Sequence, residues 1–317
     1  MTSPDRILVT PRALTARGLE HVAELLPLRQ AGYHLVSPPP GRQPSERELV
    51  GLLDRCVGWI AGIEPITEPV LAAAASLRVI SRNGTGVDNI DLAAATERCI
   101  VVQRALGANA QGVAELSIGL ALCALRNIPF SDAAIGRGEW RRWPGRELAQ
   151  STVGIVGLGA VGRHTATLAG GFGASVLGYD PYLDPALCPA GVELTELNEL
   201  VARSDVISLH CAPNADGSPL VTAQLLATFR PGAVLINTAR SGLVDEAAAL
   251  SALEEEHVSC YAFDVFDVEP PPVSKLIAHP RTITTPHIGG YTEPSIARAT
   301  SQAVRNLLEA LCAIQAS

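Results

Sequence analysis

The sequence predicts an α/β protein built from two doubly wound parallel sheets. Short runs of β-branched and apolar residues alternate with Ala-, Leu- and Glu-rich segments of helix length, which is typical of parallel strands covered by helices. The 317 residues exceed what one ordinary core holds, so two domains are expected. With 47% hydrophobic and 18% charged residues, the composition is that of a globular chain.

The first domain is expected to contain five strands and no nucleotide site. No glycine-rich turn follows any of its strand candidates, and two clear helical stretches, 46–54 and 67–75, lie among them. The strand candidates are 6–10, 33–36, 57–60, 78–80 and 100–102.

A long helix over 110–126 precedes the second βα series. It is apolar on most faces, which predicts burial between domains or subunits. Six strands then alternate with helices, as a dinucleotide-binding sheet requires, and an amphipathic helix over 293–314 ends the chain. The six strand candidates are 153–156, 175–179, 206–210, 233–237, 259–263 and 282–285.

The second domain carries a glycine fingerprint for a dinucleotide. Gly157 permits a tight turn after the strand, Gly159 lets the pyrophosphate approach the backbone, and Gly162 lets helix and strand pack closely. The pyrophosphate would bind the free N–H groups of the helix N-terminus. Glycines used only for packing are the alternative, but Asp180 ends the next strand, where a carboxylate binds ribose hydroxyls. Because Asp180 repels a 2′-phosphate and no arginine follows in 181–183, we expect NAD rather than NADP.

Three residues after later strands of this domain are the catalytic candidates. Arg240 can grip a carboxylate with two parallel hydrogen bonds, although a surface arginine is the alternative. His287 is presented rigidly between Pro286 and two glycines, and Glu269 would be its buried partner, stabilising the protonated ring. Such a ring can give a proton to a ketone oxygen as hydride reaches the carbon. A purely structural Glu–His pair remains the competing interpretation.

Composition excludes several other classes. A net charge of −8 argues against a nucleic-acid partner, and the apolar runs are too short for a membrane span. The first ten residues lack the pattern of a secretory leader. The seven cysteines are scattered and show no metal-ligand spacing, so we expect free thiols in the cytoplasm and no metal.

Eight motifs give the chain a resemblance to one known family. The sequence resembles the D-isomer-specific 2-hydroxyacid dehydrogenases, a family that includes D-3-phosphoglycerate dehydrogenase. The motifs are NGTGVDNID (83–91), VAEL (113–116), GLGAVG (157–162), YDP (179–181), HCAP (210–213), NTAR (237–240), FDVF (263–266) with Glu269-Pro270, and PHIGG (286–290).

The resemblance implies an NAD-dependent interconversion of a 2-oxo acid and its D-2-hydroxy acid. It implies a flavodoxin-like, discontinuous substrate-binding domain over 1–103, a Rossmann NAD-binding domain over 104–289, and a last helix over 290–317 that returns to the first domain. Arg240, Glu269 and His287 would be catalytic, and Arg82, Asn83 and Gly84 would meet the substrate. A homodimer joined near 110–140 is also implied. The NAD site would be lined by Thr85, Gly157, Gly159, Ala160, Val161, Gly162, Asp180, Cys211, Ala212, Thr238, Ala239, Arg240, Asp264, His287, Gly289 and Gly290.

Departures from the family pattern bear on the substrate. Relatives specific for phosphoglycerate carry a basic residue after the third strand, whereas this chain has Ile-Ala-Gly-Ile-Glu over 60–64, although Arg82 could compensate. Tyr291 stands where a small residue is usual. We expect no regulatory domain after the last helix. Oxidation of a small anion such as formate or phosphite is an alternative activity. An NAD-sensing corepressor-like binding module is another, although the long tails of a corepressor are absent.

Overall fold

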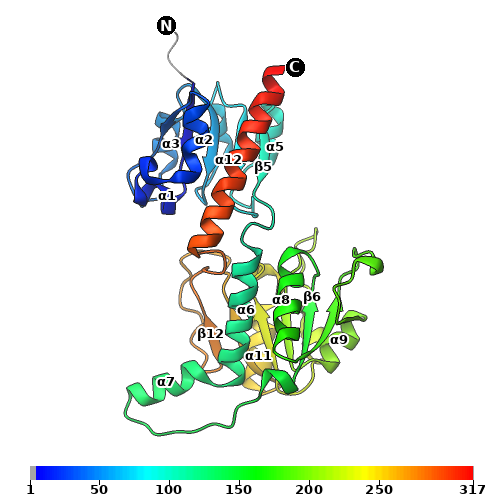
Figure 1. The fold of residues 1–317 in the computed structure, drawn as a ribbon. Coiled ribbons are helices and arrows are strands. Elements are labelled where there is room, and N and C mark those ends of the chain that lie inside the picture. The colour runs from blue at the N-terminus through cyan, green and yellow to red at the C-terminus, as the bar shows by residue number, and fades with distance from the viewer. Residues whose placement is uncertain (1–4, 317) are drawn as a thin grey trace. The chain divides into compact units, whose positions relative to one another are not determined.

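The computed structural model describes residues 5–316, and the chain divides into two compact units (Figure 1). The first unit holds residues up to Asn109 together with the segment from Glu293 onward, and the second runs from Ala110 to Thr292. The sequence had suggested divisions after residues 103 and 289. The first division lies later because Ala105 N still donates to Arg82 O (3.3 Å) and Gly84 O (3.0 Å) of the first unit. The expected lack of a secretory leader concerns a segment of which residues 1–4 lie outside the described part.

The first unit is a five-stranded, all-parallel sheet in the order β2-β1-β3-β4-β5. This is the flavodoxin-like order. The strands are β1 (Arg6–Val9), β2 (His34–Val36), β3 (Cys56–Ala61), β4 (Val79–Arg82) and β5 (Val101–Arg104). The helices are α1 (Arg12–Arg17), α2 (Leu26–Gln30), α3 (Glu46–Leu52), α4 (Glu68–Ala72), α5 (Leu92–Glu97) and α12 (Glu293–Ala316).

Helices cover both faces of this sheet because successive strand residues point to opposite sides. On one face, Ile7 and Ile60 pack against Leu307 of α12, which lies along the sheet in Figure 1. On the other face, Trp59 packs in a core shared with α3, α4 and α5. Ser81 Oγ also donates to Ala303 O (2.8 Å), a buried bond between β4 and α12.

The second unit is a seven-stranded, all-parallel sheet in the order β12-β11-β10-β9-β6-β7-β8. Six of these strands follow the Rossmann order, which confirms the predicted fold class. The strands are β6 (Thr152–Val156), β7 (Ser175–Tyr179), β8 (Val192–Leu194), β9 (Val206–Leu209), β10 (Ala233–Asn237), β11 (Val258–Phe263) and β12 (Thr282–Thr284). The helices are α6 (Ala110–Leu125), α7 (Ile128–Gly136), α8 (Ala160–Gly171), α9 (Leu197–Arg203), α10 (Ala223–Leu226) and α11 (Glu246–Glu254).

The two faces of the second sheet carry separate cores. Helices α6 and α8 pack on one face around Ile155 and Ile236, while α9, α10 and α11 cover the other around Leu235 and Phe263. The N-terminus of α11 is capped by Asp245, whose Oδ1 accepts from Ala247 N (3.1 Å) and Ala248 N (3.0 Å).

Two elements of the second unit were not predicted. Strand β8 has three residues and lies at the sheet edge, so its Val-Glu-Leu alternation is too short to stand out in the sequence. Helix α7 follows α6 after Asn127, whose left-handed φ of 55° turns the chain before the new helix. Within the described residues no single helix is long and apolar enough to cross a membrane. Helices α6 and α7 meet these two criteria only when they are counted together, as a pair bent by 60°.

Candidate active site

The glycine loop lies between β6 and α8, at the carboxyl edge of the second sheet. Gly157 has a φ of 94°, and a Cβ there would lie 2.8 Å from the backbone of His210 and Cys211. A Cβ on Gly162 would lie 1.9 Å from Gly157 O, so the helix could not pack as it does. A Cβ on Gly159, in contrast, would meet nothing within 4 Å. Gly159 therefore faces open space, which leaves room for a phosphate to reach the backbone.

The N-terminus of α8 is built to receive an anion. Gly159 is its N-cap and offers no side-chain oxygen to the first N–H groups, which belong to Ala160, Val161 and Gly162. Helix N-termini with free N–H groups and a favourable dipole bind phosphates. The residues present thus fit the pyrophosphate of a dinucleotide.

Asp180 follows β7 and supports the glycine loop. Its Oδ2 accepts from Leu158 N (2.9 Å) and its Oδ1 accepts from Tyr182 N (3.0 Å). The carboxylate is therefore held beside the turn that carries Gly157 and Gly159. The bond to Leu158 was not expected from the sequence, because it joins residues that meet only through strand pairing.

The segment after β9 closes the other side of the glycine loop. His210 is half-buried, its Nε2 lies 2.9 Å from Ser208 Oγ, and desolvation of the ring lowers its pKa to about 3. Burial raises the pKa of the Cys211 thiol to about 11, and Asp180 nearby adds to this. Both groups are consequently neutral at pH 7, so neither supplies charge or a thiolate. Ala212 continues this segment.

The Arg240 loop follows β10 and is organised by Asn237. The buried Asn237 amide donates from Nδ2 to Arg240 O (2.8 Å) and accepts at Oδ1 from Ala239 N (3.1 Å). Thr238 Oγ1 lies 2.8 Å from Ser117 Oγ of α6. The Arg240 guanidinium donates from NH1 to Ala239 O (2.7 Å).

The predicted Glu–His pair is present after β11 and β12. His287 Nδ1 lies 2.7 Å from Glu269 Oε1, and Nε2 makes no hydrogen bond to the described residues. The prediction that Glu269 is buried is wrong, because its side chain is 37% exposed, and the His287 side chain is 51% exposed. Loops that project beyond the strand ends reach solvent. One ring nitrogen is thus bound by a carboxylate, while the other can meet a substrate.

The His287 loop is anchored on Asp264, which directly follows β11. The buried Asp264 carboxylate accepts at Oδ1 from Thr285 Oγ1 (2.6 Å) and Ile288 N (2.8 Å), and at Oδ2 from Gly289 N (2.7 Å). His287, with a φ of 53°, lies between these donors. Gly290 follows in the turn closed by Tyr291 N donating to Ile288 O (2.8 Å). Sequence reasoning treated Asp264 only as a cofactor contact and missed this support.

Four expected site residues belong to the first unit: Arg82 ends β4, and Asn83, Gly84 and Thr85 follow it. Asn83 N donates to Ala61 O (2.9 Å), and Thr85 Oγ1 donates to Ala105 O (3.4 Å). Asn83 Oδ1 is buried and accepts no hydrogen bond from the residues described. Arg82 and Gly84 are neighbours here, since a Cβ on Gly84 would lie 2.9 Å from Arg82 NH1.

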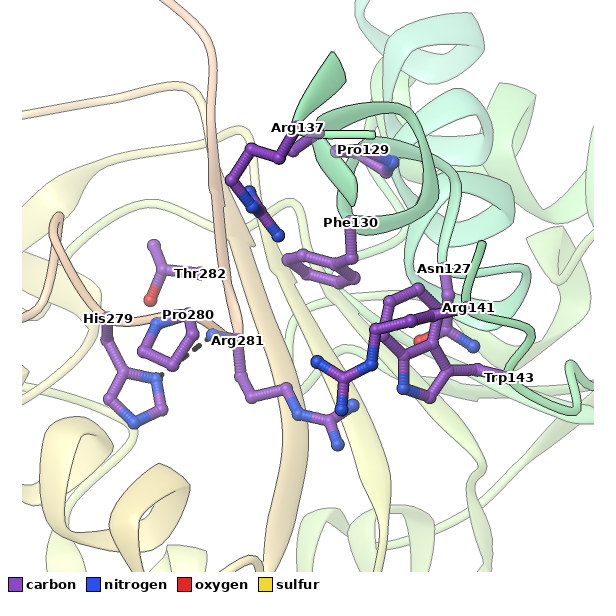
Figure 2. Close-up of a pocket in the computed structure, with 11 residues that line it drawn as sticks. Asn127, Pro129, Phe130, Arg137, Arg141, Trp143, His279, Pro280, Arg281 and Thr282 are labelled. Carbon is purple, nitrogen blue, oxygen red and sulfur yellow. Dashed lines mark hydrogen bonds between the residues drawn. The ribbon is translucent and has the colours of Figure 1, made fainter. Parts of the chain in front are cut away.

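A hollow of about 500 Å³ elsewhere in the second unit contains none of the predicted site residues (Figure 2). It is lined by Phe130 from α7, Arg137 directly after that helix, Trp143 from the next loop, and His279 and Arg281 before β12. Over residues 5–316 no group of three or more His, Cys, Asp or Glu side chains could hold a metal ion.

Comparisons with known proteins agree with this architecture. Residues 118–289 match the family model of the D-isomer specific 2-hydroxyacid dehydrogenase, NAD binding domain. The D-3-phosphoglycerate dehydrogenase of Methanocaldococcus jannaschii is 42% identical over 232 residues, which are 72% of this chain and 44% of that protein. The chain thus spans about half the length of the curated relatives that it matches.

Two solved structures extend the similarity to nearly the whole chain. A glyoxylate reductase from Paecilomyes thermophila is 29% identical, with a TM-score of 0.84 and coverage of 98% of this chain and 96% of that one. The NAD⁺-bound 3-phosphoglycerate dehydrogenase of Entamoeba histolytica is 28% identical, with a TM-score of 0.79 and coverage of 96% and 95%. The resemblance noted in the sequence is confirmed: this chain belongs to the D-isomer specific 2-hydroxyacid dehydrogenase family.

Proposed function

We propose that this protein interconverts a 2-oxo acid and its D-2-hydroxy acid with NAD as the hydride carrier. The observation that carries the proposal is the 2.7 Å contact between His287 Nδ1 and Glu269 Oε1, on the same sheet edge as an open glycine loop. When NAD is bound, it accepts or supplies the hydride. A proton donor and a dinucleotide cradle on one edge are what such a reaction requires.

In this proposal His287 is the acid/base residue. Its Nε2 gives a proton to the carbonyl oxygen during reduction and removes it during oxidation, while Glu269 fixes the ring through Nδ1. Arg240 binds the substrate carboxylate with its planar guanidinium and helps to polarise the carbonyl. The positions of all three at strand ends of one parallel sheet support these roles.

The proposed NAD site comprises the glycine loop and the residues named from the resemblance. Asp180 binds the adenine ribose hydroxyls, and its charge disfavours a 2′-phosphate. Thr238, Ala239, Gly289 and Gly290 contribute from the two later loops, and Cys211 and Ala212 from the loop after β9. Asp264 contributes to this site indirectly, because its carboxylate holds the backbone N–H of Gly289. From the first unit we propose Thr85 as a cofactor contact and Arg82, Asn83 and Gly84 as substrate contacts.

We further propose a cytoplasmic homodimer joined through the region 110–140. Exposed apolar side chains support this surface: Ile128 is 50%, Ile135 61% and Trp140 83% exposed. Large exposed apolar side chains in one region mark interaction sites. The seven free cysteines fit a reducing compartment. Sedimentation of the purified protein tests the dimer, and a single monomeric species at micromolar concentration would contradict it.

The activity is tested by following NADH absorbance with glyoxylate, hydroxypyruvate, pyruvate and 3-phosphohydroxypyruvate. We expect at least one 2-oxo acid to be reduced with NADH and much more slowly with NADPH. Reduction of 3-phosphohydroxypyruvate alone would identify the protein as a D-3-phosphoglycerate dehydrogenase, the activity named for the Methanocaldococcus jannaschii relative. No turnover with any of the four acids, in a protein that binds NADH, would contradict the proposal.

A further inference from the structure

The side chain of Asn237 makes the hydrogen bonds that hold the short turn 237–240. It is fully buried at the end of β10, and its amide group bridges Ala239 N (3.1 Å) and Arg240 O (2.8 Å). A third contact, from Nδ2 to Tyr261 Oη at 3.4 Å, is long. A buried amide can donate and accept at once, so it closes the turn 237–240 at both ends. The main chain of Arg240 is thereby fixed relative to the strand.

Asp264 likewise fixes the backbone of the neighbouring loop, which carries His287, but it does so with a carboxylate. Its donors are one hydroxyl and two backbone N–H groups, which flank His287 on both sides in the chain. A carboxylate accepts several hydrogen bonds and donates none, which suits a loop that presents only donors. Hydrogen bonds to a carboxylate are stronger than those to a neutral acceptor, so three of them can hold His287 in its left-handed conformation.

The two supports are adjacent but act on different loops. Strands β10 and β11 are paired, and Asp264 N donates to Asn237 O (3.0 Å). No side-chain bond of Asn237 reaches the His287 loop, and none of Asp264 reaches the Arg240 loop, over the residues described. Each support can therefore be removed while the other stays.

We propose that Asn237 and Asp264 are positioning residues with separate roles: Asn237 positions Arg240, and Asp264 positions His287. The roles of the two positioned residues rest on the function proposed above. A displacement of about 1 Å can lower turnover by about a hundredfold, so loss of either support has a large effect without any contact to substrate. Asn237 then governs carboxylate binding, and Asp264 governs proton transfer.

The test compares Asn237→Ala and Asp264→Asn with the unmodified protein in four measurements. Asn237→Ala is expected to weaken inhibition by oxamate, a non-reducible 2-oxo acid analogue, by about tenfold, with the pH dependence of turnover unchanged. Asp264→Asn is expected to lower kcat by about tenfold or more and to shift that pH dependence, with oxamate inhibition within about threefold. NADH affinity should stay within about threefold in both. The fourth measurement is amide hydrogen exchange, in which Asn237→Ala exposes Ala239 N–H and Asp264→Asn exposes Ile288 N–H and Gly289 N–H.

Matched controls separate positioning from loss of folding. Tyr261→Phe removes only the long contact of Asn237 and should leave oxamate inhibition unchanged. Thr285→Val removes one of the three donors to Asp264 and should give a smaller effect than Asp264→Asn. If Asp264→Asn weakens NADH binding strongly while the pH dependence stays, Asp264 is a cofactor contact and the proposed role is wrong. If both variants change all kinetic readouts equally, the supports are not separate.

Hydrogen exchange tests the two loop supports independently of the proposed enzymatic activity. If the unmodified protein reduces no 2-oxo acid but the exchange pattern appears as expected, the function fails and the loop supports stand. If activity is present but both variants leave exchange unchanged, the supports are refuted and the function stands.

Discussion

The two parallel sheets differ most where their strand order reverses, between β1 and β3 in the first unit and between β6 and β9 in the second. In the first unit Glu64, only 2% exposed, occupies this edge: its Oε1 accepts from Gly62 N (2.9 Å) and from Thr10 Oγ1. Trp59 Nε1 donates to the same Thr10 hydroxyl (2.9 Å). In the second unit the corresponding edge holds Gly159, with open space beside it.

The difference shows that the strand order creates a crevice at the reversal point, but the side chains there determine whether a ligand can bind. Open α/β sheets bind ligands at the reversal point, outside the carboxyl ends of the strands. A buried carboxylate and its donors fill that place in the first unit, whereas glycines and a helix N-terminus leave it available in the second. Five perturbations test this difference between a filled and an open edge, and their expected effects on function decrease from the first to the last.

The largest effect is expected from His287→Asn, which removes the proton donor from the open edge. Turnover should fall by about a hundredfold or more, because general acid–base catalysis contributes factors of this size. NADH affinity, measured by fluorescence, should hardly change. The matched control is His279→Asn, a histidine of the hollow in Figure 2, which should retain full activity. Equal losses in the two variants would remove His287 from its proposed role.

Gly162→Ala should disturb the glycine loop at the edge between β6 and β9. The added methyl would lie 1.9 Å from Gly157 O, so the helix must move away from the loop. We expect NADH affinity to fall by about tenfold or more and the free energy of unfolding to fall by about 1–3 kcal/mol. Gly170→Ala on the same helix meets nothing within 4 Å and should be neutral or slightly stabilising. An unchanged NADH affinity in Gly162→Ala would show that close packing is dispensable for the cofactor.

Acid should weaken the second unit through His210. Burial lowers the pKa of this ring to about 3, below its ordinary 6.5, so between those values the unfolded chain binds a proton that the folded chain does not. Stability is therefore highest above pH 6.5 and falls as the pH decreases, by about 1–2 kcal/mol between pH 7 and pH 5 for one proton. Urea unfolding at both values measures this. His210→Gln should flatten the difference, and an equal fall in that variant would assign the acid sensitivity to other groups.

Asp180→Asn tests the assignment of the cofactor. The amide retains an acceptor for Leu158 N but loses the charge that opposes a 2′-phosphate. We expect the preference for NADH over NADPH, expressed as a ratio of kcat/KM values, to fall by up to about tenfold, which corresponds to about 1.4 kcal/mol. Asp184→Asn is the control, in a nearby carboxylate that accepts from Ala186 N (3.0 Å), and it should keep the preference.

The smallest effect on function is expected from Glu64→Gln in the filled edge. The change replaces a buried acceptor by an amide, so the free energy of unfolding should decrease by about 1–3 kcal/mol. NADH affinity should not change, because Glu64 is not among the residues proposed to contact the cofactor. A clear change in NADH affinity, with stability unaffected, would mean that the edge between β1 and β3 takes part in cofactor binding.

Much of the fold could be predicted because its signals are local. The βα alternation, the glycine loop before α8 and the Asp245 cap each depend on residues close together in the chain. Strand β8 and helix α7 were missed because a short exposed edge strand and a helix after a left-handed Asn127 carry weak patterns. The burial expected for Glu269 was wrong because exposure depends on where neighbouring loops end, which no local pattern encodes.

The sequence by itself determined the family, the fold class and which residue types are available for catalysis, since motif spacing and strand pattern suffice for these. Only the tertiary structure decided how those residues are held. Asp180 on Leu158, Asn237 on Arg240, and Asp264 on the His287 loop are side-chain-to-backbone bonds at strand ends. Two of them, those of Asp180 and Asp264, connect segments more than twenty residues apart, and such bonds form only after parallel strands pair. The physical reason is that a side chain finds a distant backbone donor only when the sheet brings both to one edge.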